Sequence, residues 1–478
     1  MQRSRRIGSL ALLFVGLDAV LLTCGSQPAR AGYRVELGPS DGLALDQPRV
    51  AIEVFDVSNS GVPSSLGPGL YNTLLLDTAS NSIIVVGGAV TELAGAGYQT
   101  VAIYDEQGVA GFTPMGVSRP YAFDFAGSSG IRHRLSDVRL LSNGQLNFGS
   151  FNGIVGMPAM VGRTTTMDMT VWSGGLLDLG FLDVAFSSEV PPGNGHRYTV
   201  PLTLVDFPQV GQRHPTDPLP IWAPLPAADV TLHHGPRQVH SRFLVDTGAQ
   251  LSVISSAAAF ALGLDANGNG SFEEEKMYDL PVGGVGGEVI APILAVDALA
   301  VGTDDNVDLL WTDLAVAVLD IDSSIAGVLG MELLTSGWFG RLLGGENGYI
   351  DRVHFDFRQA DQMTGAMLLD INPTLDIMTY VPRLGDMDLD EDVDFDDIPG
   401  FVLGLTNPSA YLNQYGMSAA LHGDLDQSGS FDFDDIQPFV ALLSAGGSAR
   451  AGVQPVPEPA PLWLLTAGLA MLWLHGRI

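Results

Sequence analysis

The chain has 478 residues, of which 46% are hydrophobic and 58 are glycine, so it is long enough for two to four domains with real cores and is not a disordered polypeptide. Its formal net charge of −32 argues against a nucleic-acid partner, because phosphate binding needs clustered Lys and Arg. The acidity is uneven, since residues 381–445 hold 13 Asp and Glu against one Arg.

Residues 1–31 predict a secretory signal peptide. A basic start is followed by an apolar run at 7–22 and by Ala-Arg-Ala at 29–31, which is the pattern of such peptides. The sole cysteine, Cys24, lies in this segment, so cleavage after Ala31 leaves a mature protein without a thiol or a disulfide. We therefore expect an exported protein, located in the cell envelope or outside the cell.

Residues 32–195 consist of short β-rich runs separated by Gly, Pro, Asn and Ser, for example at 49–55, 98–104 and 121–125. No long stretch of this segment carries the apolar period of a helix, so it predicts a mostly antiparallel β lobe. A Pro-rich connection follows at 191–226, and the pattern restarts as a second β lobe over 196–380. The expected fold class is therefore mainly β.

Two similar strand-turn-strand units each carry one aspartate. Asp77 follows an apolar run, and 169 positions later Asp246 does the same, with a second apolar run after each turn. Two branched apolar residues and a glycine come later in both halves, ending at Gly156 and at Gly330, which are 79 and 84 positions after the respective aspartates. A two-motif order kept at nearly the same spacing indicates an internal duplication.

Asp-Thr-Gly-Ala at 246–249, with apolar residues on both sides and a later apolar-apolar-Gly, resembles the bilobal pepsin-type aspartic peptidases, with retropepsin-like features in the second half. The resemblance covers about residues 45–370 and implies the pepsin-like acid-protease fold, a polypeptide substrate and no cofactor for catalysis. Two carboxylates held close together share one proton, so such a pair can activate a water and protonate a peptide carbonyl. The residues that the resemblance implies are Asp77 and Asp246 as the catalytic dyad, Thr78 and Thr247 as braces between the lobes, and Gly248 as the position of close approach.

The first half departs from the family pattern at two places. Ala79 stands where the family has glycine, and alanine is strained there if the position needs a positive φ. The expected flap over the substrate is the hairpin at 121–130, in which Phe125 occupies the place of the family's tyrosine, and Tyr121 substitutes only if the register shifts. These departures leave open a non-catalytic surface binding protein that keeps the peptidase fold.

Residues 381–445 contain two acidic loops 38 positions apart, each followed by an apolar helix-like segment, at 398–405 and 436–443. Both loops place oxygen side chains at the positions that surround a calcium ion in loop-helix calcium sites. The pair resembles a type I dockerin, which implies a small α-helical calcium-binding module and a cohesin-like protein partner, and docking is then an alternative main role. The expected Ca²⁺ ligands are Asp386, Asp388, Asp390, Asp392, Asp394, Asp397, Asp424, Asp426, Ser428, Ser430, Asp432 and Asp435.

Two further segments carry patterns that bear on function. Residues 265–276 contain the first half of a calcium loop, but Lys276 stands where a carboxylate is expected, so both metal binding and a plain polar loop stay open. Residues 446–478 form a linker and a tail with Pro-Glu-Pro at 457–459 and an apolar run at 462–474. This tail resembles the PEP-CTERM sorting signal, which implies an apolar sorting helix, a transient membrane contact and a sorting enzyme of the exosortase type.

Overall fold

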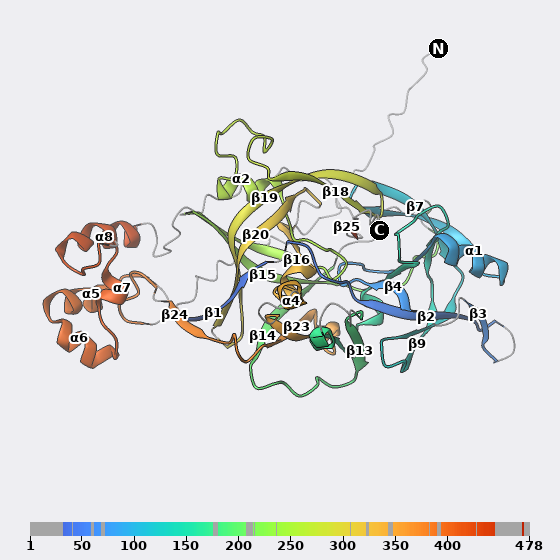
Figure 1. Ribbon diagram of the computed structural model, residues 1–478, viewed down its shortest axis with the longest axis horizontal. Helices are drawn as coiled ribbons and strands as arrows, with labels where there is room; N and C mark the ends of the chain where they lie inside the picture. Colours follow the sequence, from blue (N-terminus) through green and yellow to red (C-terminus); the bar gives the residue numbers. More distant parts are fainter. Residues whose placement is uncertain are drawn as a thin grey trace, which may run out of the picture.

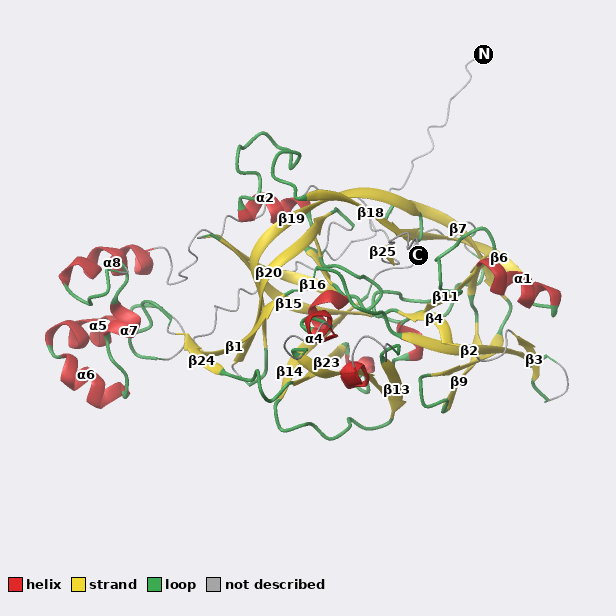
Figure 2. Ribbon diagram, in the orientation of Figure 1, coloured by secondary structure: helices red, strands yellow, loops and turns green. Residues whose placement is uncertain are grey.

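The computed structural model describes residues 32–444 and 471–472, with gaps at 41, 59–61, 68–71, 175–179, 207–213, 215, 236, 306, 322–324, 343–347, 382, 390–392 and 427. The predicted signal peptide at 1–31 lies outside the described residues, and so does the tail at 446–478 apart from residues 471–472. The described chain is mainly β, as predicted, and a group of helices lies at one end of the long axis (Figure 1 and Figure 2). No helix in these ranges is long and apolar enough to cross a membrane.

The first half of the chain forms a ten-stranded sheet in the order β6-β7-β10-β5-β11-β4-β2-β8-β9, with β3 paired to β2. In β2 the alternate residues Val50, Ile52 and Val54 are fully buried, so this strand shows the period-two pattern of a sheet with one face on the core. The strands of this sheet are β2 (Arg49–Asp56), β3 (Ser64–Gly67), β4 (Asn72–Leu76), β5 (Ile83–Val86), β6 (Thr100–Gly108), β7 (Gly111–Ser118), β8 (Tyr121–Ala126), β9 (Arg132–Val138), β10 (Leu141–Asn143) and β11 (Gly153–Val155).

The second sheet has fifteen strands and draws on both halves of the chain. Its order is β13-β12-β22-β23-β14-β15-β16-β21-β17-β20-β19-β18-β25, and β1 is inserted beside β20 and β24. Its strands are β1 (Gly32–Pro39), β12 (Thr164–Asp168), β13 (Asp183–Ser187), β14 (Arg197–Val205), β15 (Leu225–His234), β16 (Arg237–Val245), β17 (Val253–Ile254), β18 (Tyr278–Gly284), β19 (Gly287–Gly302), β20 (Val307–Val318), β21 (Gly327–Leu329), β22 (Ile350–Asp356), β23 (Thr364–Ile371), β24 (Met378–Val381) and β25 (Met471–Leu472).

The two aspartate loops lie in the same arrangement of strands. In the first half β4 pairs parallel with β11, which pairs antiparallel with β5. In the second half β16 pairs parallel with β21, which pairs antiparallel with β17. A helix then follows in each half, α1 (Gly87–Gly95) after β5 and α2 (Ser256–Leu262) after β17. This repeated topology is what an internal duplication produces.

The two halves share one continuous hydrophobic core, which runs from β1 to β23. A buried polar network crosses it along the neighbouring strands β12, β22, β23 and β14. Arg197 donates from Nε and Nη2 to the Asp370 carboxylate at 2.6 and 2.9 Å, and Nδ1 of His354 lies 2.8 Å from Oγ1 of Thr166. Because Thr166 belongs to the first half of the chain and the other three residues to the second, the network holds the halves together.

The helical group after residue 384 has its own small core, which includes Met387, Phe401, Tyr411 and Phe439. It is attached to the end of β24, since Oη of Tyr380 lies 3.2 Å from Nε2 of His422. Its helices are α5 (Asp397–Thr406), α6 (Pro408–Tyr415), α7 (Ala420–Gly423), η5 (Phe433–Asp435) and α8 (Ile436–Ser444). The other short helices are η1 (Met157–Ala159), η2 (Thr170–Gly174), α3 (Met331–Leu334), α4 (Trp338–Leu342) and η4 (Ala360–Gln362).

Candidate active site and metal centre

Each aspartate stands at the end of a buried strand, where the chain turns. The backbone N–H of Asp77, directly after β4, donates to the Val155 carbonyl of β11 at 3.1 Å. In the second half the N–H of Asp246, directly after β16, donates to the Leu329 carbonyl of β21 at 2.9 Å. The parallel neighbour strand therefore fixes the start of both turns. Asp77 is fully buried and Asp246 is 1% exposed.

The threonines that follow the aspartates bind each other's loops through four hydrogen bonds. Thr78 donates from Oγ1 to the Val245 carbonyl at 2.6 Å, and Thr247 donates from Oγ1 to the Leu76 carbonyl at 2.7 Å. Each hydroxyl also accepts the other threonine's backbone N–H, at 3.1 and 3.0 Å. Both threonines are buried, so the reciprocal brace joins the two loops in a low-dielectric place where its hydrogen bonds are strong.

The two carboxyls form one electrostatic unit. Oδ1 of Asp77 accepts the Ala79 N–H at 2.7 Å, and Oδ1 of Asp246 accepts the N–H groups of Gly248 and Ala249 at 2.7 and 3.1 Å. Oδ2 of each aspartate is buried and accepts no hydrogen bond from a donor among the described residues. Each of these oxygens is therefore left for a proton, a water or a substrate atom.

Burial raises the pKa of both aspartates, because the charged form of a carboxyl is poorly solvated there. The charge of the neighbouring Asp77 carboxyl raises the pKa of Asp246 further. The pair therefore keeps one proton between its carboxyls over a wide pH range and loses its two protons in separate steps.

Gly248 and Ala79 occupy corresponding places after the two aspartates. A Cβ atom added to Gly248 would lie 2.8 Å from Cγ of Asp77 and 3.0 Å from Oδ1 of Asp246, so a side chain there would displace both carboxyls. Ala79 is fully buried and is not among the residues with positive φ, so its methyl group causes no strain of that kind. The first loop therefore keeps its hydrogen bond to Asp77 although it lacks the glycine of the family pattern.

A buried glutamate supports the second loop, and the sequence analysis did not single it out. Oε1 of Glu332, in α3, accepts the Ser252 N–H at 2.8 Å, and Oγ of Ser252 accepts the Gly330 N–H at 3.0 Å. Glu332 is 1% exposed, and burial raises its pKa to about 7. The Glu332 carboxyl thus connects the strand after the Asp246 turn to the glycine motif while it remains neutral in acid.

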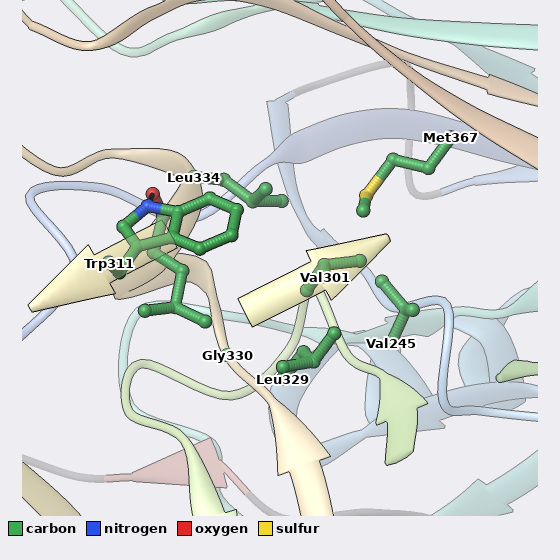
Figure 3. A pocket seen from close by; sticks show the side chains of 8 residues that line it. Val245, Val301, Trp311, Leu329, Gly330, Leu334 and Met367 are labelled. Carbon is green, nitrogen blue, oxygen red and sulfur yellow. Dashed lines mark hydrogen bonds between the residues drawn. The ribbon is translucent and has the colours of Figure 1, made fainter. Parts of the chain in front are cut away.

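A small apolar cavity lies near the second loop, as Figure 3 shows, and it offers no polar group to a substrate. Its lining residues are Val245, Val301, Trp311, Leu329, Gly330, Leu333, Leu334 and Met367.

The residues of the predicted flap, Tyr121 and Phe125, lie in β8 and are both fully buried. Oη of Tyr121 accepts the Gln99 N–H at 2.8 Å, and the Phe125 ring packs edge-on against Phe186, with ring centroids 4.9 Å apart. Strand β8 is paired on both sides, with β2 and with β9. These side chains serve as core residues of the first sheet.

Two other hairpins, one from each half, meet at their tips. They are β6–β7 and β18–β19, which lie close together along one edge of the molecule in Figure 1. A Cβ atom added to Gly108 would lie 1.7 Å from the Val285 carbonyl oxygen, and one added to Gly286 would lie 2.5 Å from that of Gly111. Only glycine permits this approach of the two backbones. The glycine-rich run at 283–287 was the sequence signal for this contact.

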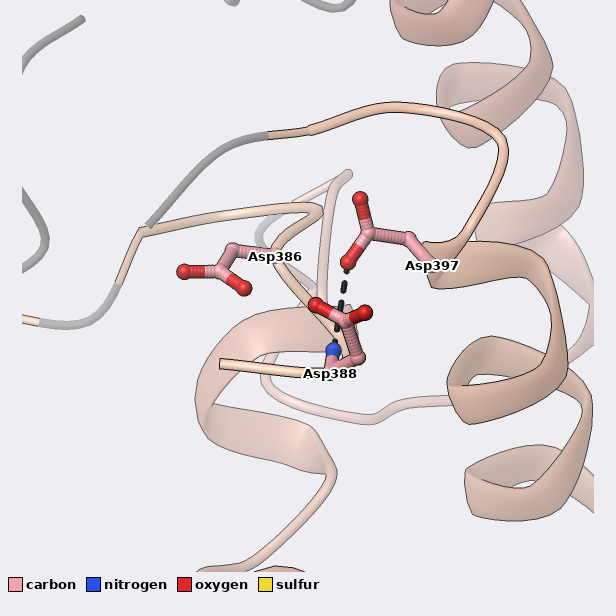
Figure 4. Close-up of side chains that lie close together, drawn as sticks. All are labelled: Asp386, Asp388 and Asp397. Atoms are coloured by element: carbon pink, nitrogen blue, oxygen red, sulfur yellow. Dashed lines mark hydrogen bonds between the residues drawn. The ribbon is translucent and has the colours of Figure 1, made fainter. Parts of the chain in front are cut away.

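Each acidic loop of the helical group after residue 384, called the helical module below, brings three carboxylates together. Oxygen atoms of Asp386, Asp388 and Asp397 lie within 4.8 Å of one another, and those of Asp424, Asp426 and Asp435 do the same. Figure 4 shows the side chains of the first group close together. Hard oxygen donors repeated in this way suit Ca²⁺. Of the other expected ligands, Asp390 and Asp392 lie outside the described residues, and the structure places Asp394, Ser428, Ser430 and Asp432 at exposed positions of the same loops.

The two loops have the same local structure. Oδ1 of Asp397 accepts the Met387 and Asp388 N–H groups, and 38 positions later Oδ1 of Asp435 accepts the Leu425 and Asp426 N–H groups. The last carboxylate of each loop therefore folds back over the first residues in the same way. In the loop at 265–276, by contrast, Nζ of Lys276 donates to Glu273 and Asp279 at 2.5 and 2.7 Å, and no group of three close carboxylates is found there among the described side chains.

Residues 229–333 match a protein-family model described as aspartyl protease. The matched segment begins in β15 and ends in α3, so it contains Asp246, Gly248 and Gly330 but not Asp77. It supports a peptidase function for the chain. Comparison with curated proteins gives no match.

Proposed function

We propose that the chain is an exported aspartic endopeptidase with Asp77 and Asp246 as its dyad. The observation that carries the proposal is the pair of buried carboxyls on two loops that the reciprocal bonds of Thr78 and Thr247 join. The family match to the second half supports a peptidase, and the repeated topology extends the same chemistry to the first half.

In this mechanism a water lies between the carboxyls. Asp77, taken here as the ionised partner, accepts a proton from the water while the water oxygen forms a bond to the substrate carbonyl carbon. Asp246 donates its proton to the carbonyl oxygen, which gives a tetrahedral diol. Asp77 then gives its proton to the amide nitrogen, Asp246 takes a proton from a hydroxyl of the diol, and the C–N bond breaks, so the dyad again holds one proton, on Asp246. The low dielectric of the buried site strengthens each of these interactions.

The test is cleavage of an unfolded protein at acid pH by three variants. Asp77→Asn and Asp246→Asn should each abolish cleavage, whereas Asp229→Asn, a change at an exposed aspartate of β15, should leave the rate unchanged. An unchanged rate in either dyad variant would contradict the proposal. Absence of both proteolysis and pepstatin binding in the wild type, across the acid range, would favour the non-catalytic binding protein.

We propose further that the helical module binds Ca²⁺ through the two carboxylate groups centred on Asp397 and Asp435. Bound Ca²⁺ would offset the repulsion among three neighbouring carboxylates in each loop and so stabilise the loop against the helix that follows it. Chelation should lower the helicity of the module and its melting temperature. Unchanged helicity after chelation, measured by circular dichroism, would rule the assignment out.

The same module exposes matching apolar side chains in its two repeats, and we propose that they bind a cohesin-like protein partner. Phe395 is 72% exposed and Val402 50%, and their counterparts 38 positions later, Phe433 and Val440, are 72% and 53% exposed. Isolated exposed apolar residues need no explanation, but a pair repeated in equivalent places supports a docking face. Phe395→Ser combined with Phe433→Ser should abolish capture of a cohesin domain and leave proteolysis intact.

The proposed location is the cell envelope or the extracellular space. The sequence patterns at 1–31 and 446–478 support it, as a signal peptide and as a tail recognised by an exosortase-type enzyme through a transient membrane contact. Replacing Pro-Glu-Pro at 457–459 by Ala-Ala-Ala should leave the tail uncleaved in the producing cell. Processing that is unchanged by this replacement, followed by mass spectrometry, would contradict the sorting role.

A further inference from the structure

The two hairpins whose tips meet are equivalent in register but differ in one buried side chain. In β6–β7 the last cross-strand pair is formed by Gly108 and Gly111, and in β18–β19 it is formed by Gly284 and Gly287. Two residues before the first glycine of each pair stand Glu106 and Val282, respectively. These two positions therefore lie on the same face of their hairpins, at the same distance from the tip.

Glu106 lies on the inner face of its hairpin. Side chains alternate along a strand, so Glu106 shares a face with Tyr104, which belongs to a buried cluster with Leu75, Ile84 and Val285. Leu75 lies two residues before Asp77, and Val285 comes from the tip of the opposite hairpin. The inner face at Glu106 is therefore directed toward the strands that carry the first aspartate.

Glu106 is 1% exposed, and its Oε1 is buried with no hydrogen-bond partner among the described residues. Burial raises the pKa of Glu106 to about 8, and no neighbouring charge contributes to that rise. An unpaired buried carboxyl is unfavourable, and a valine such as Val282, which is fully buried, fills the equivalent place in the other hairpin without this penalty. Packing alone therefore gives no reason for a glutamate here.

We propose that Glu106 determines substrate specificity: the place under the β6–β7 hairpin that Val285 fills becomes selective for a lysine or arginine side chain when a substrate displaces Val285, while the equivalent place at Val282 takes an apolar one. This inference rests on the proposed peptidase function. A substrate strand that binds under the two hairpin tips separates them. One substrate side chain then takes the place of Val285 beside Tyr104, where it contacts the carboxyl of Glu106.

The surroundings of Glu106 suit a long cationic side chain better than any other class. Tyr104 lies two positions away on the same face and belongs to an apolar cluster with Leu75 and Ile84, which would accommodate the methylene stem, and the Glu106 carboxyl would accept from the charged end. A charge pair formed in a buried place is much stronger than one in water, and a cation beside Glu106 removes the penalty of the unpaired carboxyl. A cation beside Glu106 would favour its ionised form, whereas an acidic side chain would add a second buried carboxyl and an apolar one of equal length would leave the carboxyl unpaired.

The experiment uses the full chain and two peptide series. Within a series the cleavable bond is kept, and each position around that bond is replaced in turn by lysine, norleucine or glutamate. For the wild type we expect a preference for lysine over norleucine on the order of ten-fold or more in kcat/KM, at one position and on one side of the bond. Glu106→Gln should reduce this preference several-fold, and Glu106→Val should reverse it in favour of norleucine. Asp105→Asn, on the opposite face of the same strand, is the matched control and should keep the wild-type preference.

Binding to the Asp246→Asn variant separates this inference from the proposed function. The same peptides, labelled with fluorescein, are titrated onto that variant with and without Glu106→Val, and thermal melting checks that both are folded. A lysine preference in binding that the valine abolishes supports the inference even if no cleavage is seen. Equal affinity for lysine and norleucine peptides in the presence of Glu106 overturns it, and leaves the peptidase proposal standing if cleavage is intact.

Discussion

The reciprocal brace between the loops predicts that a single methyl-for-hydroxyl exchange damages both stability and catalysis. Thr247→Val keeps the shape of the side chain but removes the donor to the Leu76 carbonyl and the acceptor of the Thr78 N–H. Both backbone groups are buried, and each buried group left unsatisfied costs about 1 to 3 kcal/mol. The expected loss is therefore about 2 to 6 kcal/mol of the free energy of unfolding, a large part of the about 5 to 15 kcal/mol typical of a domain.

Urea unfolding followed by tryptophan fluorescence measures this loss, and kcat/KM at acid pH measures the displacement of the dyad. Thr247→Ser is the matched control, because it keeps the hydroxyl and removes only a methyl group, so its loss should be about 1 kcal/mol or less. Thr78→Val should behave like Thr247→Val, since it removes the donor to Val245 and the other acceptor. A valine variant as stable and as active as the serine variant would refute the reasoning.

Three further predictions concern the buried Glu332, the close approach of Gly248 to Asp77, and Ca²⁺ binding by the acidic loops. Burial holds the pKa of Glu332 at about 7, above its ordinary 4.5, so between these pH values the folded state keeps a proton that the unfolded chain loses. The stability of the fold should therefore decrease as the pH rises from 4.5 through 7. Glu332→Gln should make stability less dependent on pH over this range, as measured by thermal melting at a series of pH values. Gly248→Ala, whose Cβ would lie 2.8 Å from Cγ of Asp77, should lower kcat by about 10²-fold, whereas Ala79→Gly should stay within a few-fold of wild type in the same assay. Ca²⁺ should raise the melting temperature of the wild type in calorimetry, and Asp435→Asn should lose most of that rise.

The parts of the site that follow from local sequence could be predicted, because they depend on residues that are close in the chain. An apolar run before Asp246 predicts a buried strand that ends at the carboxyl, and the structure contains that strand as β16. The spacing of the Gly156 and Gly330 motifs predicts a repeated unit, and the repeated pairing of β4 with β11 and of β16 with β21 shows how the unit is built.

The parts that depend on contacts between distant segments could not be predicted from one sequence. Tyr121 and Phe125 have the residue types of a flap, but β8 is paired on both sides, and only the three-dimensional arrangement reveals that. The hairpin tips were recognisable as glycine-rich, yet nothing in the sequence pairs Gly108 with Val285 across 177 positions. The role of Glu332 was not predicted, because a glutamate in an apolar segment gives no sign of which backbone N–H will donate a hydrogen bond to it.

The position of β1 has a consequence for how the protein is made. This strand lies at the N-terminal end of the described chain, yet it pairs with β20 and β24, so Tyr33 meets Val307 and Tyr380. Ribosomes and export channels deliver a chain from its N-terminus, so β1 emerges first and waits for partners that follow some 270 to 350 residues later. Contacts so distant in sequence slow folding and leave an unpaired strand exposed to aggregation. We expect this chain to need a holding chaperone while it is synthesised, and to gain folding speed from circular permutation that places β1 after β24.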